Sequence, residues 1–146
     1  MKIAFSFFLI VFSCLWNAQT INISSSEPKL AESIHQLDQL MENNDEKILN
    51  ILCPDVSFGH SNGWIQNFED FKKDFNSKKV IYTNIIEIEI SEVKKDRKIY
   101  SVRRKIKVSG IYKNQNFEMI LGLLEIWKKE KSVWKLWSRQ SVEIKP

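Results

Sequence analysis

The sequence predicts an α+β protein in which three helices precede one antiparallel sheet. Apolar residues recur at helical spacing in the first half of the chain, and from Val80 onward their period changes to two. Short polar links separate the strands after Val80, and short links favour antiparallel neighbours. Because the helices come before the sheet instead of alternating with its strands, we expect them to cover one face of it.

Residues 1–19 predict a secretory signal peptide, followed by a single domain of residues 20–146. Lys2 precedes an almost wholly apolar run from Ile3 to Trp16. The run is shorter than the roughly 20 residues that cross a bilayer, so we expect cleavage near Ala18, no transmembrane span, and a periplasmic or secreted protein. The alternative is a lipoprotein anchored at Cys14, because Val11-Phe12-Ser13-Cys14 resembles an acylation signal.

The three predicted helices are each marked by an apolar stripe. The first follows Ser24-Ser25-Ser26-Glu27-Pro28, a cap with proline in the first turn. The second is short and ends before Pro54, which prevents the preceding residue from continuing a helix. Asn67 is the expected cap of the third. The stripes consist of Leu30, Ile34, Leu37 and Met41, then Ile48, Leu49, Ile51 and Leu52, then Phe68, Phe71 and Phe75.

A hairpin between the second and third helices carries the most informative polar residue. Residues 55–66 read as two strands around an Asn62-Gly63 turn, a pair of residues that adopts positive φ at low cost. Val56, Phe58 and His60 share one face of the first strand. An imidazole on an apolar face is typical of a small-molecule pocket with few polar contacts.

Alternation along the four long strands assigns the other candidate residues. Arg104 shares a face with Val102 and Ile106, and a one-residue slip would turn Arg103 inward instead. A buried guanidinium must be paired, so Arg104 either pairs with an acid such as Glu118 or Glu125 or faces an anionic ligand. Further along, Gln140 shares a face with Trp134, Leu136 and Val142, whereas Lys135, Trp137 and Arg139 occupy the opposite face.

Charge and cysteine content restrict the function classes. Of the net charge of +4, residues 1–78 contribute −4 and residues 79–146 contribute +8. Export makes nucleic acid a poor partner for the basic half. Cys53 is the single cysteine after residue 19, so no internal disulfide is expected. Neither histidine has metal-ligand spacing and no glycine-rich phosphate loop occurs, so we expect no metal and no cofactor.

The order of elements resembles the nuclear transport factor 2-like superfamily, and three local sequences resemble its SnoaL-like branch. The resemblance covers about Leu30 to Val142 and is carried by Phe58-Gly59-His60-Ser61-Asn62-Gly63, Tyr100-Ser101-Val102-Arg103-Arg104 and Trp134-Lys135-Leu136-Trp137-Ser138-Arg139-Gln140. It implies a cone: a curved sheet folded over helices with a pocket at its open end. It also implies a homodimer through the convex sheet face.

The resemblance and the alternation together predict a ligand site. The predicted contacts are His60, Arg104, Gln140, Tyr100 and Trp64. The predicted function is binding of a small, partly apolar, anionic molecule. The alternative is a cofactor-independent lyase, isomerase or cyclase with His60 as general base, and a third reading is an interaction module working through the convex face. Catalytic relatives use an inward carboxylate, which the sequence does not place.

Overall fold

The structure is a computed structural model that describes residues 23–145. The predicted signal peptide and Cys14 therefore lie outside the described residues. None of the helices within residues 23–145 is long and apolar enough to cross a membrane.

The helical elements all precede the long strands, as predicted. Pro28 occupies the first turn of the longest helix, and the Asn67 side chain accepts a hydrogen bond from the backbone of Asp70 at 2.9 Å, which caps another helix. The second predicted helix is a short 3-10 helix. The elements are α1 (Ile23–Ser26), α2 (Pro28–Glu42), η1 (Glu46–Ile51) and α3 (Phe68–Asn76).

Six strands form one sheet with the order β2-β1-β6-β5-β4-β3. The last four strands are an antiparallel meander, because only short turns join them. The strands are β1 (Leu52–Gly59), β2 (Ile65–Gln66), β3 (Val80–Asp96), β4 (Ile99–Tyr112), β5 (Gln115–Glu130) and β6 (Val133–Ile144).

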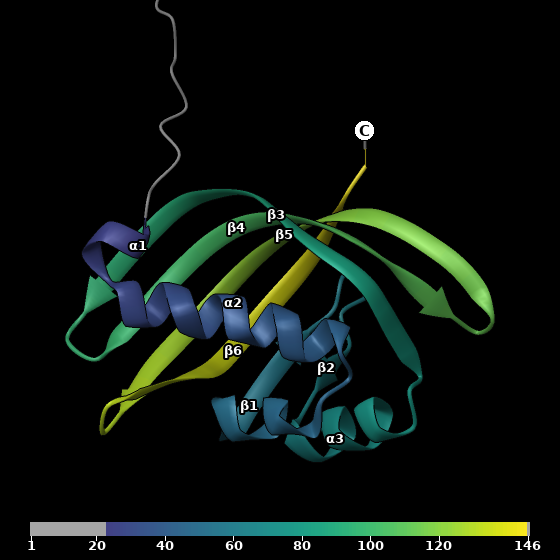
Figure 1. Cartoon of the computed structure of the whole chain (residues 1–146), viewed down its shortest axis with the longest axis horizontal. Coiled ribbons are helices and arrows are strands. Elements are labelled where there is room, and N and C mark those ends of the chain that lie inside the picture. Colours follow the sequence, from purple (N-terminus) through teal and green to yellow (C-terminus); the bar gives the residue numbers. More distant parts are fainter. Residues whose placement is uncertain (1–22, 146) are drawn as a thin grey trace, which may run out of the picture.

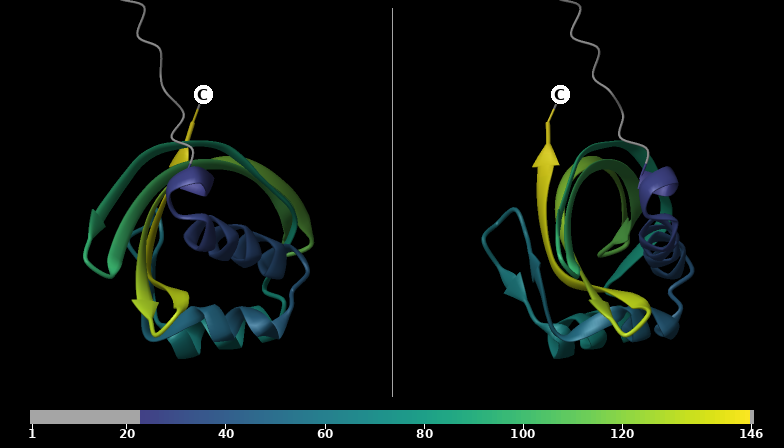
Figure 2. Two further views of the ribbon diagram at one scale, coloured as in Figure 1. Left: turned by 60° about the vertical axis from the view of Figure 1, so that its left-hand side comes forward. Right: turned by 90° about the vertical axis from the view of Figure 1, so that its left-hand side faces the viewer.

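The long strands arch over α2, which lies in the concave side of the sheet (Figure 1). The views from the side show the same arch with η1 and α3 along its lower edge (Figure 2). The β4–β5 hairpin extends past the C-terminal end of α2 (Figure 1). The concave face is therefore covered by helix over only part of its length.

The predicted α+β class and curved sheet are confirmed, with one departure in strand direction. β1 lies parallel to β6, so the sheet is mixed and not purely antiparallel. Local sequence did not indicate this pairing, because β1 and β6 are far apart in the chain and meet only when the sheet curls.

A β-bulge in β6 changes which residues face the interior. Trp127 of β5 pairs with Leu136 and Ile126 pairs with Ser138, so Trp137 has no partner in the ladder. The extra residue reverses the alternation beyond it. Arg139 therefore faces inward and Gln140 faces outward, and the prediction of the opposite arrangement is wrong.

Candidate functional site

Arg104 is the centre of a buried ionic network. Its side chain is fully buried, and its terminal nitrogens donate to both carboxylate oxygens of Asp38 at 2.6 and 2.7 Å. Its Nε and Nη2 donate to Glu125 Oε1 at 3.2 and 3.0 Å. Burial by itself would lower the pKa of Arg104, but the two carboxylates hold that pKa above its ordinary value. Arg104 is thus paired with structural acids, one of its two predicted roles.

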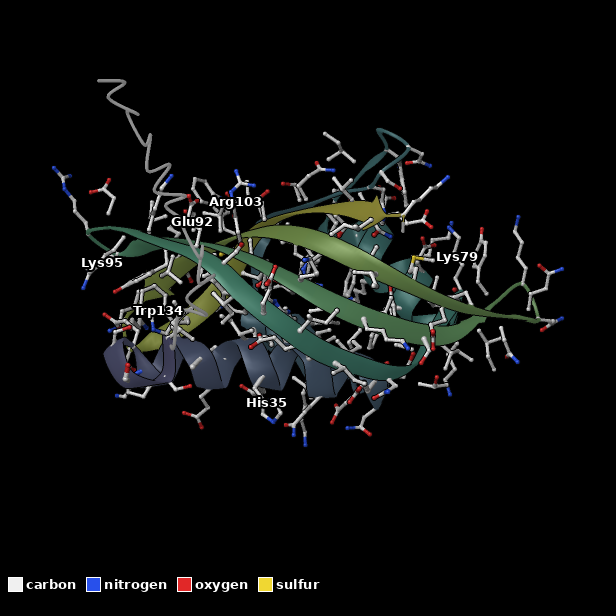
Figure 3. All side chains as sticks on the ribbon, turned by 90° about the horizontal axis from the view of Figure 1, so that it is seen from above. His35, Lys79, Glu92, Lys95, Arg103 and Trp134 are labelled. Atoms are coloured by element: carbon white, nitrogen blue, oxygen red, sulfur yellow. The ribbon has the colours of Figure 1, made fainter. Side chains whose placement is uncertain are left out.

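The structure separates the predicted partners of this arginine. Glu125 is a partner, whereas Glu118 faces outward and pairs with Lys107 at 2.9 Å. The neighbouring Arg103 also faces outward and pairs with Glu92 at 3.3 Å (Figure 3). No register slip occurs at Arg104.

Asp38 is a network residue that the sequence reading missed. It lies on α2 directly after Leu37 and four residues after Ile34, and is itself buried. Residues four apart in a helix share a face, so its position on the apolar stripe was the available signal. An acid in that stripe needs a buried cation, which β4 supplies.

Glu125 is the inward carboxylate that the sequence could not place. Arg139 Nη2 donates to its Oε1 at 2.6 Å and Trp127 Nε1 donates to its Oε2 at 3.0 Å. Burial alone would raise the pKa of Glu125, but Arg104 and Arg139 lower it to about 2. A carboxylate held ionised in this way is a poor general base.

Arg139 is less well satisfied than Arg104. Only 9% of it is exposed, and its Nε has no acceptor among residues 23–145. A buried donor without a partner typically costs about 1–3 kcal/mol. The one carboxylate that Arg139 contacts in the described part of the chain is Glu125, through the oxygen that Arg104 also contacts.

The network forms a layer across the interior. On β4 the inward positions run Val102, Arg104, Ile106, and on β5 they run Trp127, Glu125, Leu123. On β6, Arg139 follows Trp134 and Leu136. We call the part on the Trp127 side the sealed half and the part on the Leu123 side the open half.

The sealed half is packed core beneath α1 and α2. Tyr100 lies edge-on to Trp134 with ring centres 5.2 Å apart, and its hydroxyl donates to Glu27 at 2.5 Å. Figure 3 shows Lys95 and Trp134 at this end of the sheet. Tyr100, a predicted ligand contact, thus lies in helix-covered core.

The open half carries an apolar face that is only partly covered. Ile106, Val108 and Leu123 are buried there. The side chains packed on them remain partly exposed, although they face inward. We call this set the inner wall: Ile106, Val108 and Leu123 with Tyr82, Ile85, Phe117, Met119 and Leu121.

His60 belongs to a separate cluster beside the start of β3. Its ring stacks on Trp64 at 4.8 Å, and its Nε2 lies 3.2 Å from Gln66 Oε1. The Gln66 amide donates to Asp74 at 3.1 Å, so Oε1 is left to accept from His60. Lys79 pairs with Asp74 at 2.8 Å and lies over the half-exposed Trp64. Within the described part of the chain, no hydrogen bond joins this cluster to the Arg104 network.

The outer face of the sheet carries a shallow groove of about 400 Å³ that crosses β3 to β6. Gly122 lowers its floor, and Gln140 lines it, together with Val142 and Ile144. The full lining is Glu89, Ser91, Arg103, Arg104, Lys105, Gly122, Leu123, Leu124, Gln140, Val142 and Ile144. No group of three or more His, Cys, Asp or Glu side chains between residues 23 and 145 is placed to hold a metal ion.

Comparison with known proteins supports the fold and not a reaction. No family model and no curated protein matches the sequence. An NTF2-like protein of unknown function in nutrient uptake from Rhodospirillum rubrum is 18% identical, with a TM-score of 0.75 over 80% of this chain and 98% of that one. An NTF2-like protein from Cytophaga hutchinsonii is also 18% identical, with a TM-score of 0.75 over 85% of this chain and 100% of that one.

A third solved structure has a similar fold. A ketosteroid isomerase-like protein from Erwinia carotovora atroseptica is 12% identical, with a TM-score of 0.68 over 82% of this chain and 96% of that chain. Identities this low carry no residue roles from one chain to the other. Together with the arch of strands over α2, the three likenesses establish that this chain has the nuclear transport factor 2-like fold.

Proposed function

We propose that this protein binds a small molecule with an apolar body against the inner wall of the open half. The observation that carries the proposal is an inward-facing apolar surface that stays partly exposed. Apolar surface of this kind is costly to leave in water, at about 25 cal/mol per Å². Ligand pockets are mostly apolar with a few polar groups, and the inner wall has that composition.

Two of the five predicted contacts remain in this proposal. Trp64 lies beneath Lys79, next to the first residues of β3, and Tyr82 of that strand belongs to the inner wall. His60 stacks on Trp64, so we keep both residues as contacts at this edge of the inner wall. We leave out the other three. Arg104 and Tyr100 already donate to carboxylates, and Gln140 faces outward.

Binding of the neutral fluorophore N-phenyl-1-naphthylamine to the full chain tests the proposal. We expect Met119→Trp, which fills the inner wall, to weaken binding about tenfold or more by steric exclusion. The matched control is Ile120→Trp, one residue away on the outer sheet face. Its affinity should stay within about twofold of wild type. Equal binding by wild type and Met119→Trp would place the probe elsewhere and overturn the proposal.

The alternative of a cofactor-independent lyase, isomerase or cyclase receives less support. Nε2 of His60 is engaged with Gln66, so only Nδ1 would remain to take a proton. The nearest carboxylate in its hydrogen-bond chain, Asp74, is reached only through Gln66. The buried Glu125 is held ionised by two arginines. His60 is thus oriented by an amide and not by a carboxylate, and Glu125 lacks the arrangement of a general base.

We also propose a homodimer through the outer sheet face. Ile86, Val142 and Ile144 are large apolar residues exposed on that face, and a shallow groove crosses it. Val142→Glu should convert the dimer to a monomer in size-exclusion chromatography with light scattering, because it places a charge in apolar contact. Val133→Glu, an exposed residue at the start of β6, is the control. A monomeric wild-type protein would contradict the dimer.

For the N-terminal segment we propose removal as a signal peptide and export of a single domain. The basis is the apolar run after Lys2. Mass spectrometry of the mature protein distinguishes the two forms. A free N-terminus near residue 20 supports secretion, and a diacylated Cys14 supports the lipoprotein alternative.

A further inference from the structure

We infer that Arg139 is the anchor for a carboxylate group and that the ligand of the inner wall is an apolar monocarboxylic acid. This inference rests on the proposed function, whose chemistry it makes specific. The observation behind it is that the two buried arginines differ in their hydrogen bonds: Arg104 donates to two carboxylates, whereas Arg139 donates to one and its Nε has no acceptor within residues 23–145. Arg139 was expected on the outer face and brings a cation to the interior only because of the bulge at Trp137.

Of the two buried arginines, Arg139 has fewer hydrogen-bond acceptors. Arg104 contacts both oxygens of Asp38 and one of Glu125. Among the described residues, Arg139 contacts one carboxylate oxygen, the Glu125 oxygen that Arg104 also contacts, at 2.6 Å. Its Nε–H, almost entirely buried, finds no acceptor within residues 23–145. An oxygen supplied by a ligand would complete this guanidinium.

The position of Arg139 joins this donor to the inner wall. On β5 its neighbour across the ladder is Glu125, and the next inward residue toward the open half is Leu123, a member of the inner wall. A ligand lying on the wall therefore reaches Arg139 with one end.

The surrounding charges favour one carboxylate over a phosphate. Asp38 and Glu125 already balance the charge of the two arginines, so a bound carboxylate adds one negative charge to the layer, whereas a phosphate dianion would add two in a partly buried site. Glu87, which is 43% exposed, adds a further carboxylate at 3.5 Å from Arg104. A guanidinium edge matches the planar geometry of a carboxylate.

Competition against N-phenyl-1-naphthylamine tests this assignment on the full chain. The competitors are 4-phenylbutanoate and its neutral amide, 4-phenylbutanamide, which have the same apolar body. In wild type we expect the acid to displace the probe at about tenfold lower concentration than the amide, the effect of one charge-assisted hydrogen bond. Arg139→Gln should reduce this preference to less than about twofold, whereas Arg139→Lys should retain part of it.

Arg103→Gln is the matched control, because it removes an arginine from the outer face of β4 and should leave the preference unchanged. Circular dichroism reports whether each variant is folded. Equal displacement by acid and amide in wild type, with the probe still bound, overturns the role of Arg139 and leaves the inner-wall site standing. An acid preference that survives in folded Arg139→Gln overturns it as well. A wild type that binds no probe overturns the proposed function and this inference together.

Discussion

The sealed and open halves of the interior are built from the same strands, yet helices cover the inward side chains of one half and leave those of the other partly exposed. In the sealed half, Trp127, Trp134 and Leu136 are buried beneath α1 and α2. In the open half, Phe117, Met119 and Leu121 alternate inward in the same way and remain partly exposed. The difference arises because α2 ends at Glu42, while the β4–β5 hairpin continues beyond it (Figure 1).

The layer between the two halves explains how charged groups are tolerated there. Asp38, Arg104, Glu125 and Arg139 are paired with one another at the point where core gives way to a partly exposed wall. Buried charges are retained at such places when they are paired. The comparison teaches that helix length, and not strand pattern, decides which part of an arched sheet is core and which part can receive a ligand.

Breaking the charged layer should have the largest effect. Glu125→Gln removes the carboxylate that pairs with both Arg104 and Arg139, so two buried guanidinium groups lose a charged partner. Removing one partner of a buried ion pair costs about 3–5 kcal/mol, which urea unfolding would measure. Glu118→Gln, on the outer face of the same strand, should cost at most about 1 kcal/mol. Similar losses in both variants would contradict a special role for the layer.

Equivalent truncations in the two halves should differ in cost. Leu136→Ala removes a fully buried side chain under the helices and should lower the free energy of unfolding by about 2–5 kcal/mol. Leu121→Ala removes a partly exposed side chain of the inner wall, and about 1 kcal/mol is expected because less area leaves water on folding. Equal values would mean that the open half is packed as core.

Acid should weaken the layer in a defined range. The pKa of Glu125 falls from 4.5 to about 2 on folding, so its contribution to stability is complete above about pH 4.5. It is lost as pH falls toward 2. Urea unfolding between pH 6 and pH 2 should show a steeper loss for wild type than for Glu125→Gln. Parallel curves would show that Glu125 is not the group responsible.

The smallest effect is expected at Gln140, three residues beyond the bulged Trp137. Gln140→Ala alters an exposed residue and should change stability by less than about 0.5 kcal/mol, without weakening binding of the fluorescent probe. If Gln140→Ala abolished probe binding while Arg139→Gln did not, the inward and outward assignments of these two residues would be reversed.

Part of the candidate site could be predicted, and the wrong placement of Arg139 and Gln140 has a single cause. Alternation correctly placed Arg104 inside and Arg103 outside, because β4 runs without interruption opposite β5. The same argument failed on β6, because Trp137 bulges out of the ladder and reverses the faces beyond it. The sequence near Trp137 carries no glycine or proline that would mark such a bulge.

The sequence by itself determined the α+β class, the helix stripes, a turn in the first hairpin and the meander of long strands, because periodicity and turn chemistry are local properties. In that turn Gly63 adopts a positive φ and Asn62 does not, so the loop between Gly59 and Ile65 is longer than the predicted two-residue turn. Only the tertiary structure decided that β1 lies parallel to β6, that Asp38 meets Arg104, and that Arg139 enters the interior. These facts depend on segments distant in the chain and on a single unpaired residue. Such arrangements are fixed only when the sheet closes over α2.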